Sequence, residues 1–148
     1  MALELDGQPF TASVASYLDH HPDRTRPNSA IYVRVILPIG NGVEVLALLD
    51  TGSPYCILSP DFCNQLGLRP VDGFRTTLNT RGGSVEGWLH RVDLTIPAEA
   101  GDDLEIDATV FAPIEWRHGE FLGYSGLLGR INFAIQPNQN KFFFDLPT

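Results

Sequence analysis

One acidic residue stands where a strand-forming segment of the sequence ends. Residues 46–58 read LALLDTGSPYCIL, so Asp50 follows an apolar run and precedes Thr51 and Gly52. Aspartate is depleted in strands and costly to bury as a charge, so this position needs compensation. A tight turn can provide it by directing backbone N–H groups and a hydroxyl at the carboxylate, and Gly52 permits a positive φ. A carboxylate held in this way can act as a general base, and the alternative is an ordinary surface turn.

A second segment, residues 127–130, reads LLGR and lies far along the chain from Asp50. Two leucines and a glycine can pack closely behind a strand turn, where a larger side chain would push the two loops apart. By themselves the same residues are more often plain hydrophobic core. The segment therefore supports a site at Asp50 only in combination with the elements around it.

Apolar periodicity and turn residues predict the elements on either side of Asp50. Apolar residues alternate over residues 31–37, PIGNG supplies a turn, and the pattern resumes over residues 43–49. This pattern predicts a hairpin whose second strand ends at Asp50. Residues 59–67 predict a short helix, with a serine at the N-cap, a proline at the first helical position and a glycine at the end.

The rest of the chain predicts further strands. Residues 74–80 and 85–96 flank RGGS and predict a second hairpin with a glycine-rich tip. Residues 104–110 alternate cleanly, and KFFFDL at residues 141–146 predicts a final strand. About seven strands with one or two short helices predict an all-β fold, a small closed or partly closed β-barrel.

The N-terminal part of the chain differs in composition from the rest. Residues 19–29 read DHHPDRTRPNS, which is polar, rich in proline and without apolar periodicity, as is typical of a loop or linker. Residues 10–18 suit a strand or a helix equally well. The sequence therefore predicts an N-terminal arm and polar linker over residues 1–29 and one folded domain over residues 30–148.

The order of these motifs resembles that of the retropepsin-type aspartic proteases, the single-domain relatives of the retroviral proteases. ALLDTGS is followed by a glycine-tipped hairpin and then by GLLGR, and the resemblance covers residues 31–146. It implies a barrel of the retropepsin type in which Asp50 is the catalytic aspartate. Thr51 and Gly52 would form the turn that holds Asp50.

The resemblance also implies a set of residues that bind substrate. The hairpin tip would be a flap that closes over an extended peptide, and Ser53 would hydrogen-bond near the carboxylate. Trp88 follows the tip and would line the cleft, with packing as the alternative. The implied substrate-binding residues are Ser53, Arg81, Gly82, Gly83, Ser84 and Trp88.

A further set of residues would support the site from behind the active-site loop. These residues are Leu127, Leu128, Gly129 and Arg130. In retroviral members an acidic residue shortly after the Asp-Thr-Gly turn pairs with the arginine, but SPYC stands there in this chain, so the partner of Arg130 is unidentified. This departure, and a longer stretch between Asp50 and Gly129, indicate a cellular, bacterial-type relative.

One Asp-Thr-Gly supplies half of the required chemistry. Peptide hydrolysis by this route uses two carboxylates that share a proton, one activating water and the other donating to the carbonyl. Two copies meeting about a two-fold axis, with both Asp50 side chains facing each other, would complete the site. The terminal KFFFDLPT is a candidate dimer interface. The alternative is that Phe142 and Phe144 face the core of their own chain.

Composition excludes several classes of partner. The chain has 148 residues, with 18 Asp and Glu against 10 Lys and Arg and a pI of about 4.7, which argues against nucleic acid and anionic membrane surfaces. No apolar run is long enough to span a membrane and no leader pattern is present, so a cytoplasmic location is expected.

The sequence indicates neither a metal site nor a cofactor. His20 and His21 are adjacent in a polar loop without further ligands at a recognisable spacing, and solvated side chains account for them. Cys56 and Cys63 are too few for a disulfide framework and are expected to be small buried apolar residues. No metal and no cofactor are therefore expected.

Three functions are compatible with the sequence. The first is a homodimeric aspartic endopeptidase that hydrolyses an extended peptide, with water activated by the paired Asp50 carboxylates. The second is a catalytically silent peptide- or protein-binding module of the same fold. The third is a structural β-domain in which Asp50 only stabilises its turn.

Overall fold

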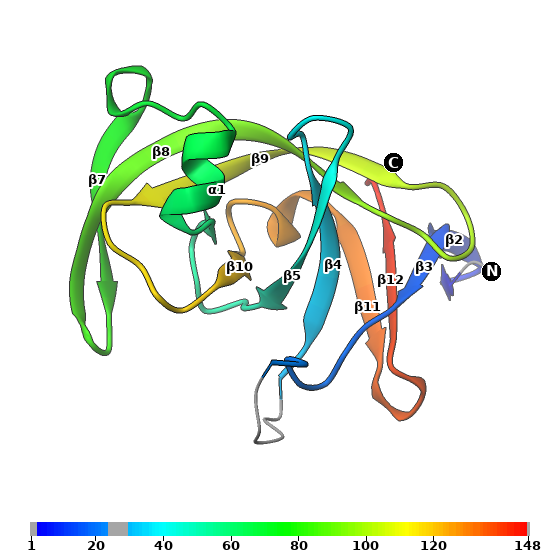
Figure 1. Cartoon of the computed structure of the whole chain (residues 1–148). Coiled ribbons are helices and arrows are strands. Elements are labelled where there is room, and N and C mark those ends of the chain that lie inside the picture. The colour runs from blue at the N-terminus through cyan, green and yellow to red at the C-terminus, as the bar shows by residue number, and fades with distance from the viewer. Residues whose placement is uncertain (1–2, 24–29, 148) are drawn as a thin grey trace.

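The computed structural model describes residues 3–23 and 30–147, which fold as a β-structure with one short α-helix in this part of the chain (Figure 1). Part of the predicted linker, residues 24–29, lies outside the described residues. The strands are β1 (Leu3–Leu5), β2 (Gln8–Thr11), β3 (Ser13–Ser16), β4 (Tyr32–Leu37), β5 (Val43–Leu49), β6 (Cys56–Ile57), β7 (Phe74–Thr80), β8 (Gly83–Ile96), β9 (Leu104–Pro113), β10 (Glu120–Leu122), β11 (Asn132–Gln136) and β12 (Lys141–Asp145). The helix is α1 (Pro60–Gln65), and short 3-10 turns are Pro70–Asp72, Leu128–Arg130 and Pro137–Gln139.

The main sheet closes on itself. Its strands are ordered β4-β5-β10-β6-β9-β8-β7, and a further pairing between β4 and β8, at Ile36 and Thr95, joins the two sides. Six strands therefore form a ring, and β7 extends from β8 as the outer strand of a hairpin, at the left in Figure 1. The predicted all-β barrel is confirmed.

Both predicted hairpins are present, with differences at their ends. β4 and β5 pair in antiparallel register up to Leu37 and Val43, as the alternation indicates. In the second hairpin Thr80 pairs with Gly83, so only Arg81 and Gly82 form the turn, and β8 begins two residues earlier than expected. Gly83 has φ of 121°, a conformation that glycine adopts without strain, so the strand pairing continues to the tip.

The predicted helix is present as α1, with Pro60 in its first turn and Gly67 in the left-handed region (φ 72°) beyond its end. The Ser59 side chain makes no capping hydrogen bond.

Sequence periodicity missed β10 and β11. β10 is only three residues long and is held by parallel pairing to β5 and antiparallel pairing to β6, so its strand conformation depends on partners distant in the sequence.

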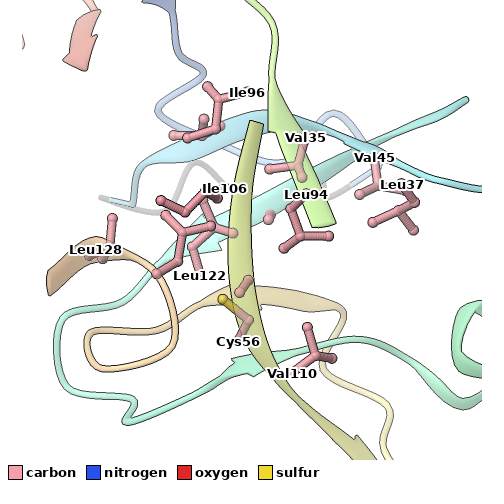
Figure 2. Close-up of a cluster of buried hydrophobic side chains, with 14 of the residues drawn as sticks. Val35, Leu37, Val45, Cys56, Leu94, Ile96, Ile106, Val110, Leu122 and Leu128 are labelled. Carbon is pink, nitrogen blue, oxygen red and sulfur yellow. The ribbon is translucent and has the colours of Figure 1, made fainter. Parts of the chain in front are cut away.

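The hydrophobic core fills the inside of the ring (Figure 2). Alternate residues of β8 and β9 point into it, which matches the two-residue period of a strand. Leu94 and Ile96 are fully buried, and Figure 2 shows Val35, Leu94 and Ile106, from β4, β8 and β9, in this cluster. Within the described residues no helix is long and apolar enough to cross a membrane.

The two ends of the described chain meet in a second, three-stranded sheet of order β11-β12-β3. Residues 10–18, whose conformation the sequence left open, are therefore largely strand, and Phe143 of β12 pairs with Val14 of β3. The division of the chain at residue 30 stays a prediction, although β3 shares a sheet with the C-terminal strand.

The C-terminal phenylalanines lie inside this chain. Phe142 and Phe144 are fully buried, their ring centroids are 5.5 Å apart, and Phe143 is 3% exposed. β12 is the central strand, with β11 on one edge and β3 on the other. Of the two alternatives for this segment the structure supports the core, because both hydrogen-bonding edges of β12 are already occupied.

Replacing Phe142 by alanine should lower the free energy of unfolding by about 3–5 kcal/mol, because the substitution leaves a cavity in a closely packed core. Urea denaturation followed by tryptophan fluorescence measures this loss. Phe74→Ala is the control, since Phe74 is 72% exposed and its removal should change stability by less than about 0.5 kcal/mol. Equal losses in the two variants would contradict the burial of β12.

Candidate active site

The turn after β5 holds the Asp50 carboxylate. The Gly52 N–H donates to Asp50 Oδ1 at 2.9 Å, and the Ser53 N–H donates to the Asp50 carbonyl at 3.1 Å. A Cβ at position 52 would lie 3.2 Å from Oδ1, so glycine is favoured there by the close approach of the carboxylate. Gly52 does not have a positive φ, and Asp50 is half-buried while Thr51 is exposed.

Ser53 lies beside the carboxylate, but its hydroxyl has another partner. Ser53 Oγ donates to the Tyr55 carbonyl at 2.9 Å, and the residue is 8% exposed. The side chain therefore stabilises the loop that follows the turn. The Asp50 N–H donates to the Leu122 carbonyl of β10 at 3.0 Å, so the same loop is tied to β10.

A glycine-containing segment, residues 123–126, packs directly against this loop. The Tyr124 N–H donates to the Ser53 carbonyl at 2.7 Å, and the Gly126 N–H donates to the Pro54 carbonyl at 2.9 Å. A Cβ at Gly123 would lie 2.1 Å from the Tyr55 carbonyl oxygen. Sequence reasoning missed this segment, although GYSG immediately before LLGR was the available signal.

The predicted supporting segment, residues 127–130, follows directly. Leu127 and Leu128 are fully buried in the core. Gly129 makes its close contacts with Tyr124 of its own loop, where a Cβ would lie 3.1 Å from the carbonyl oxygen. The tight contact with the Asp50 loop that the sequence predicts at Gly129 is therefore made by the preceding glycines.

Arg130 has partners that the sequence did not reveal. Its Nη1 donates to the Asp107 carbonyl at 2.7 Å, and its Nη2 donates to Thr109 Oγ1 at 2.6 Å. Both acceptors lie on β9, and the Thr109 N–H donates to the Gly126 carbonyl at 2.9 Å. Arg130 thus fastens the supporting segment to the barrel wall.

A cavity of about 660 Å³ opens beside Asp50. It lies between the active-site turn, the tip of the β7–β8 hairpin, and the loop that joins β9 to β10. Within the described residues, Asp50 is the only carboxylate in its lining. The lining residues are Asp50, Gly52, Ser53, Pro54, Ile57, Leu78, Asn79, Thr80, Arg81, Gly82, Trp116, His118 and Phe121.

Only some of the hairpin residues that were expected to bind substrate line this cavity. Arg81 and Gly82 line it, whereas Gly83 and Ser84 are not in its lining. The Ser84 hydroxyl donates to Asn79 Oδ1 at 3.0 Å across the hairpin. The tip of the hairpin therefore stands over the cavity through its turn residues.

Trp88 is not in the lining of this cavity. It pairs across the hairpin with Arg75, whose guanidinium carbon lies 5.8 Å from the centre of the indole ring. Val85 packs against the cluster that includes Ile57, and side chains alternate along a strand, so Trp88 belongs to the opposite face. Trp88 therefore packs on the hairpin and does not line the cavity beside Asp50.

The aromatic residues in the cavity come instead from the loop after β9 and from β10. Trp116 has its ring centroid 5.5 Å from that of Phe121 and 4.8 Å from that of His118. Its Nε1 donates to the Gly119 carbonyl at 2.7 Å, which holds the ring in place. These residues belong to the longer stretch between Asp50 and Gly129, and the aromatic residues in EWRHGEF, residues 115–121, were the available signal for a binding surface.

The two cysteines are buried thiols in this structure. Cys56 is fully buried, and Cys63 donates from Sγ to the Leu58 carbonyl at 3.3 Å. Burial raises the pKa of the Cys56 thiol to about 11 and that of Cys63 to about 12. Both are therefore poor nucleophiles near neutral pH.

A sequence model of a family described as aspartyl protease matches residues 33–116, more than half of the chain. The chain belongs to this aspartyl protease family.

Within the described part of the chain, no group of three or more His, Cys, Asp or Glu residues is placed to hold a metal ion.

The aspartyl protease also resembles individual proteins. It is 31% identical over 87 residues to DNA damage-inducible protein 1 of Yarrowia lipolytica, an alignment that covers 57% of this chain and 21% of that protein. The chain thus spans about a fifth of the length of this relative.

Two solved structures support the retropepsin-like fold. A retropepsin-like aspartic protease from Rickettsia conorii aligns with a TM-score of 0.57 at 16% identity, over 88% of this chain and 97% of the other. The retroviral protease-like domain of Ddi1 from Leishmania major aligns with a TM-score of 0.52 at 19% identity, over 80% and 94%. The aspartyl protease therefore has a retropepsin-like fold, as the motif order indicates.

Gly123→Ala should destabilise the protein by about 1–3 kcal/mol, because the new methyl group overlaps a backbone oxygen of the Asp50 loop. Thermal unfolding by calorimetry reports the loss as a lower Tm. Gly82→Ala is the control, since the nearest atom to its Cβ would be Thr80 Oγ1 at 3.8 Å. An unchanged Tm in Gly123→Ala would show that the two loops do not meet as described.

Neither thiol of the native protein should react appreciably with a thiol reagent at about pH 8, because burial raises both pKa values and blocks access. In urea both thiols should react. Since the raised pKa favours the neutral thiol in the folded state, stability should fall as pH rises above about 9, where the unfolded thiols ionise. Rapid labelling of native protein, measured by mass spectrometry, would contradict the burial of the cysteines.

Proposed function

We propose that this aspartyl protease is an endopeptidase that hydrolyses an extended peptide as a homodimer. The observation that carries the proposal is the Asp50 carboxylate, oriented by the Gly52 N–H and exposed to a cavity of about 660 Å³. In the described residues that cavity contains no second acid, so each chain supplies one half of the acid–base pair. The family supports the type of reaction.

The proposed reaction needs two Asp50 side chains with different protonation. Two carboxylates brought together cannot both ionise easily, so they share one proton and titrate as a pair. The charged carboxylate removes a proton from water, which attacks the peptide carbonyl, and the protonated carboxyl donates to the carbonyl oxygen. Two copies of the chain related by a two-fold axis beside Asp50 would bring the two carboxylates together.

The β7–β8 hairpin has the proposed role of a flap. Its turn residues Arg81 and Gly82 line the cavity above Asp50. A peptide lying in the cavity would be enclosed by this hairpin on one side and by the active-site turn on the other. Closure of this kind excludes water from the reacting bond and positions the peptide.

The expected cytoplasmic location stays a prediction.

Asp50→Asn should abolish peptide hydrolysis, by about a thousandfold or more, because the amide cannot act as a general base. The amide oxygen still accepts the Gly52 N–H, so Tm should change little. Cleavage of a peptide library is measured over acidic to neutral pH, with Asp61→Asn on the exposed surface of α1 as the control. Failure of the wild-type protein to cleave any peptide would overturn the proposal.

The same variant distinguishes the other two functions. A silent binding module predicts that Asp50→Asn and wild-type protein bind the same peptides and that neither hydrolyses them. A structural role for Asp50 predicts a lower Tm as the main effect, measured by calorimetry. Full activity in Asp50→Asn would exclude the catalytic role of this residue.

Mixing wild-type and Asp50→Asn chains tests the homodimer. If each site needs two Asp50 residues, an equimolar mixture after subunit exchange should retain about one quarter of the activity of the same total amount of wild-type protein. A site contained in one chain would retain about one half. Activity is measured after dilution and incubation to allow exchange, with a mixture of wild type and Asp61→Asn as the control.

A further inference from the structure

Two arginines of this protein have no ionic or hydrogen-bonding partner within the described residues. The sequence has 10 Lys and Arg, of which Arg24 and Arg26 lie outside that part. Six of the remaining eight are engaged: Arg34 with Glu44, Arg69 with Asp72, Arg75 with Glu86, Arg91 with Asp107, Arg130 with Thr109, and Lys141 with Ser16. Arg81 and Arg117 are the two that are not.

This lack of partners stands out in an acidic protein. Acidic residues outnumber basic ones by 18 to 10, so an arginine at an arbitrary surface position readily finds a carboxylate. An unpaired guanidinium keeps all five of its N–H donors available. Within the described residues, these two arginines therefore have guanidinium groups available to an external anion.

One unpaired arginine lies at the candidate active site, and the other lines a neighbouring cavity. Arg81, in the turn of the β7–β8 hairpin, lines the cavity that contains Asp50. Arg117 lines a smaller cavity of about 210 Å³. His118 lines both cavities, so the two are neighbours, and a peptide in the first can continue past His118 into the second.

Carboxylates also line both cavities. In the first cavity the carboxylate is Asp50, which the proposed reaction requires. In the second, Glu120 accepts the Ser59 N–H at 3.2 Å, and the Asp23 carboxylate lies 3.9 Å from His21 Nδ1. No ion pair joins Arg81 or Arg117 to these carboxylates within the described residues, so each guanidinium keeps its N–H donors for a ligand, although the chain as a whole carries a formal charge of −8.

We propose that the cleft selects peptides with acidic side chains, one contacting Arg81 close to the scissile bond and another contacting Arg117 beyond His118. A guanidinium binds a carboxylate through two parallel hydrogen bonds, which adds geometric specificity to the charge. The net negative charge of the protein repels acidic peptides at long range. Selection consequently depends on these short-range pairs and weakens as salt increases.

This proposal rests on the proposed function, and binding is measured apart from cleavage to separate the two. Position-scanning peptide libraries with Glu, Gln or Lys at each position are tested for binding to Asp50→Asn protein and for cleavage by wild-type protein. Glu should be preferred over Gln by about fivefold at each of two positions at low salt, the strength of an exposed ion pair. The preference should decline in high salt.

Variants assign each preference to one arginine. Arg81→Gln should remove the preference at the position nearer the scissile bond, and Arg117→Gln should remove the other. Arg81→Lys should keep part of the preference, and Arg81→Glu should reverse it toward Lys. Arg75→Gln is the matched control, because Arg75 is on the same hairpin but pairs with Glu86 on the face that carries Trp88.

Equal binding of Glu and Gln peptides, or a preference that survives in Arg81→Gln and Arg117→Gln, would overturn the acidic selection. Binding of no acidic peptide to Asp50→Asn protein would also overturn it. Binding with an acidic preference but no cleavage by wild-type protein would contradict the proposed function alone. Cleavage without an acidic preference would contradict only the selection.

Discussion

The position of the Asp50 carboxylate depends on a backbone contact between two loops that are distant in the sequence. Residues 53–56 lie against residues 123–126, joined by hydrogen bonds to the Ser53 and Pro54 carbonyls. Each such bond contributes about 1 kcal/mol net, but the larger constraint is steric. A side chain at Gly123 would overlap the Tyr55 carbonyl, so only glycine allows the two backbones to approach this closely.

Continuous strand pairing links this loop contact to the β7–β8 hairpin, whose turn lines the cavity beside Asp50. Arg130 and the backbone at Thr109 fasten the supporting segment to β9. β9 pairs with β8 along most of its length, and β8 continues into the hairpin whose turn lines the cavity. The proposed general base and the proposed flap are therefore held by the same barrel wall, and only the hairpin tip extends free of it (Figure 1).

The terminal sheet and the cavity beside Asp50 limit how a second chain and a substrate would bind. β12 is flanked by β11 and β3, so the proposed homodimer would not form by adding strands to β12. Substrate would meet a cavity with apolar and aromatic walls, formed in part by Ile57, Trp116 and Phe121. Arg81 adds an unpaired guanidinium to this lining, which also contains the Asp50 carboxylate.

The sequence by itself determined the elements that depend on local residues and short spacings. These are the two hairpins, α1, and the turn in which Gly52 contacts the Asp50 carboxylate, because alternation and turn residues act between near neighbours. Only the tertiary structure decided the rest. β10 becomes a strand through pairing with β5 and β6, Arg130 finds its acceptors on β9, and Trp116 rather than Trp88 reaches the cavity. These features arise from contacts between residues far apart in the chain, which local pattern does not encode.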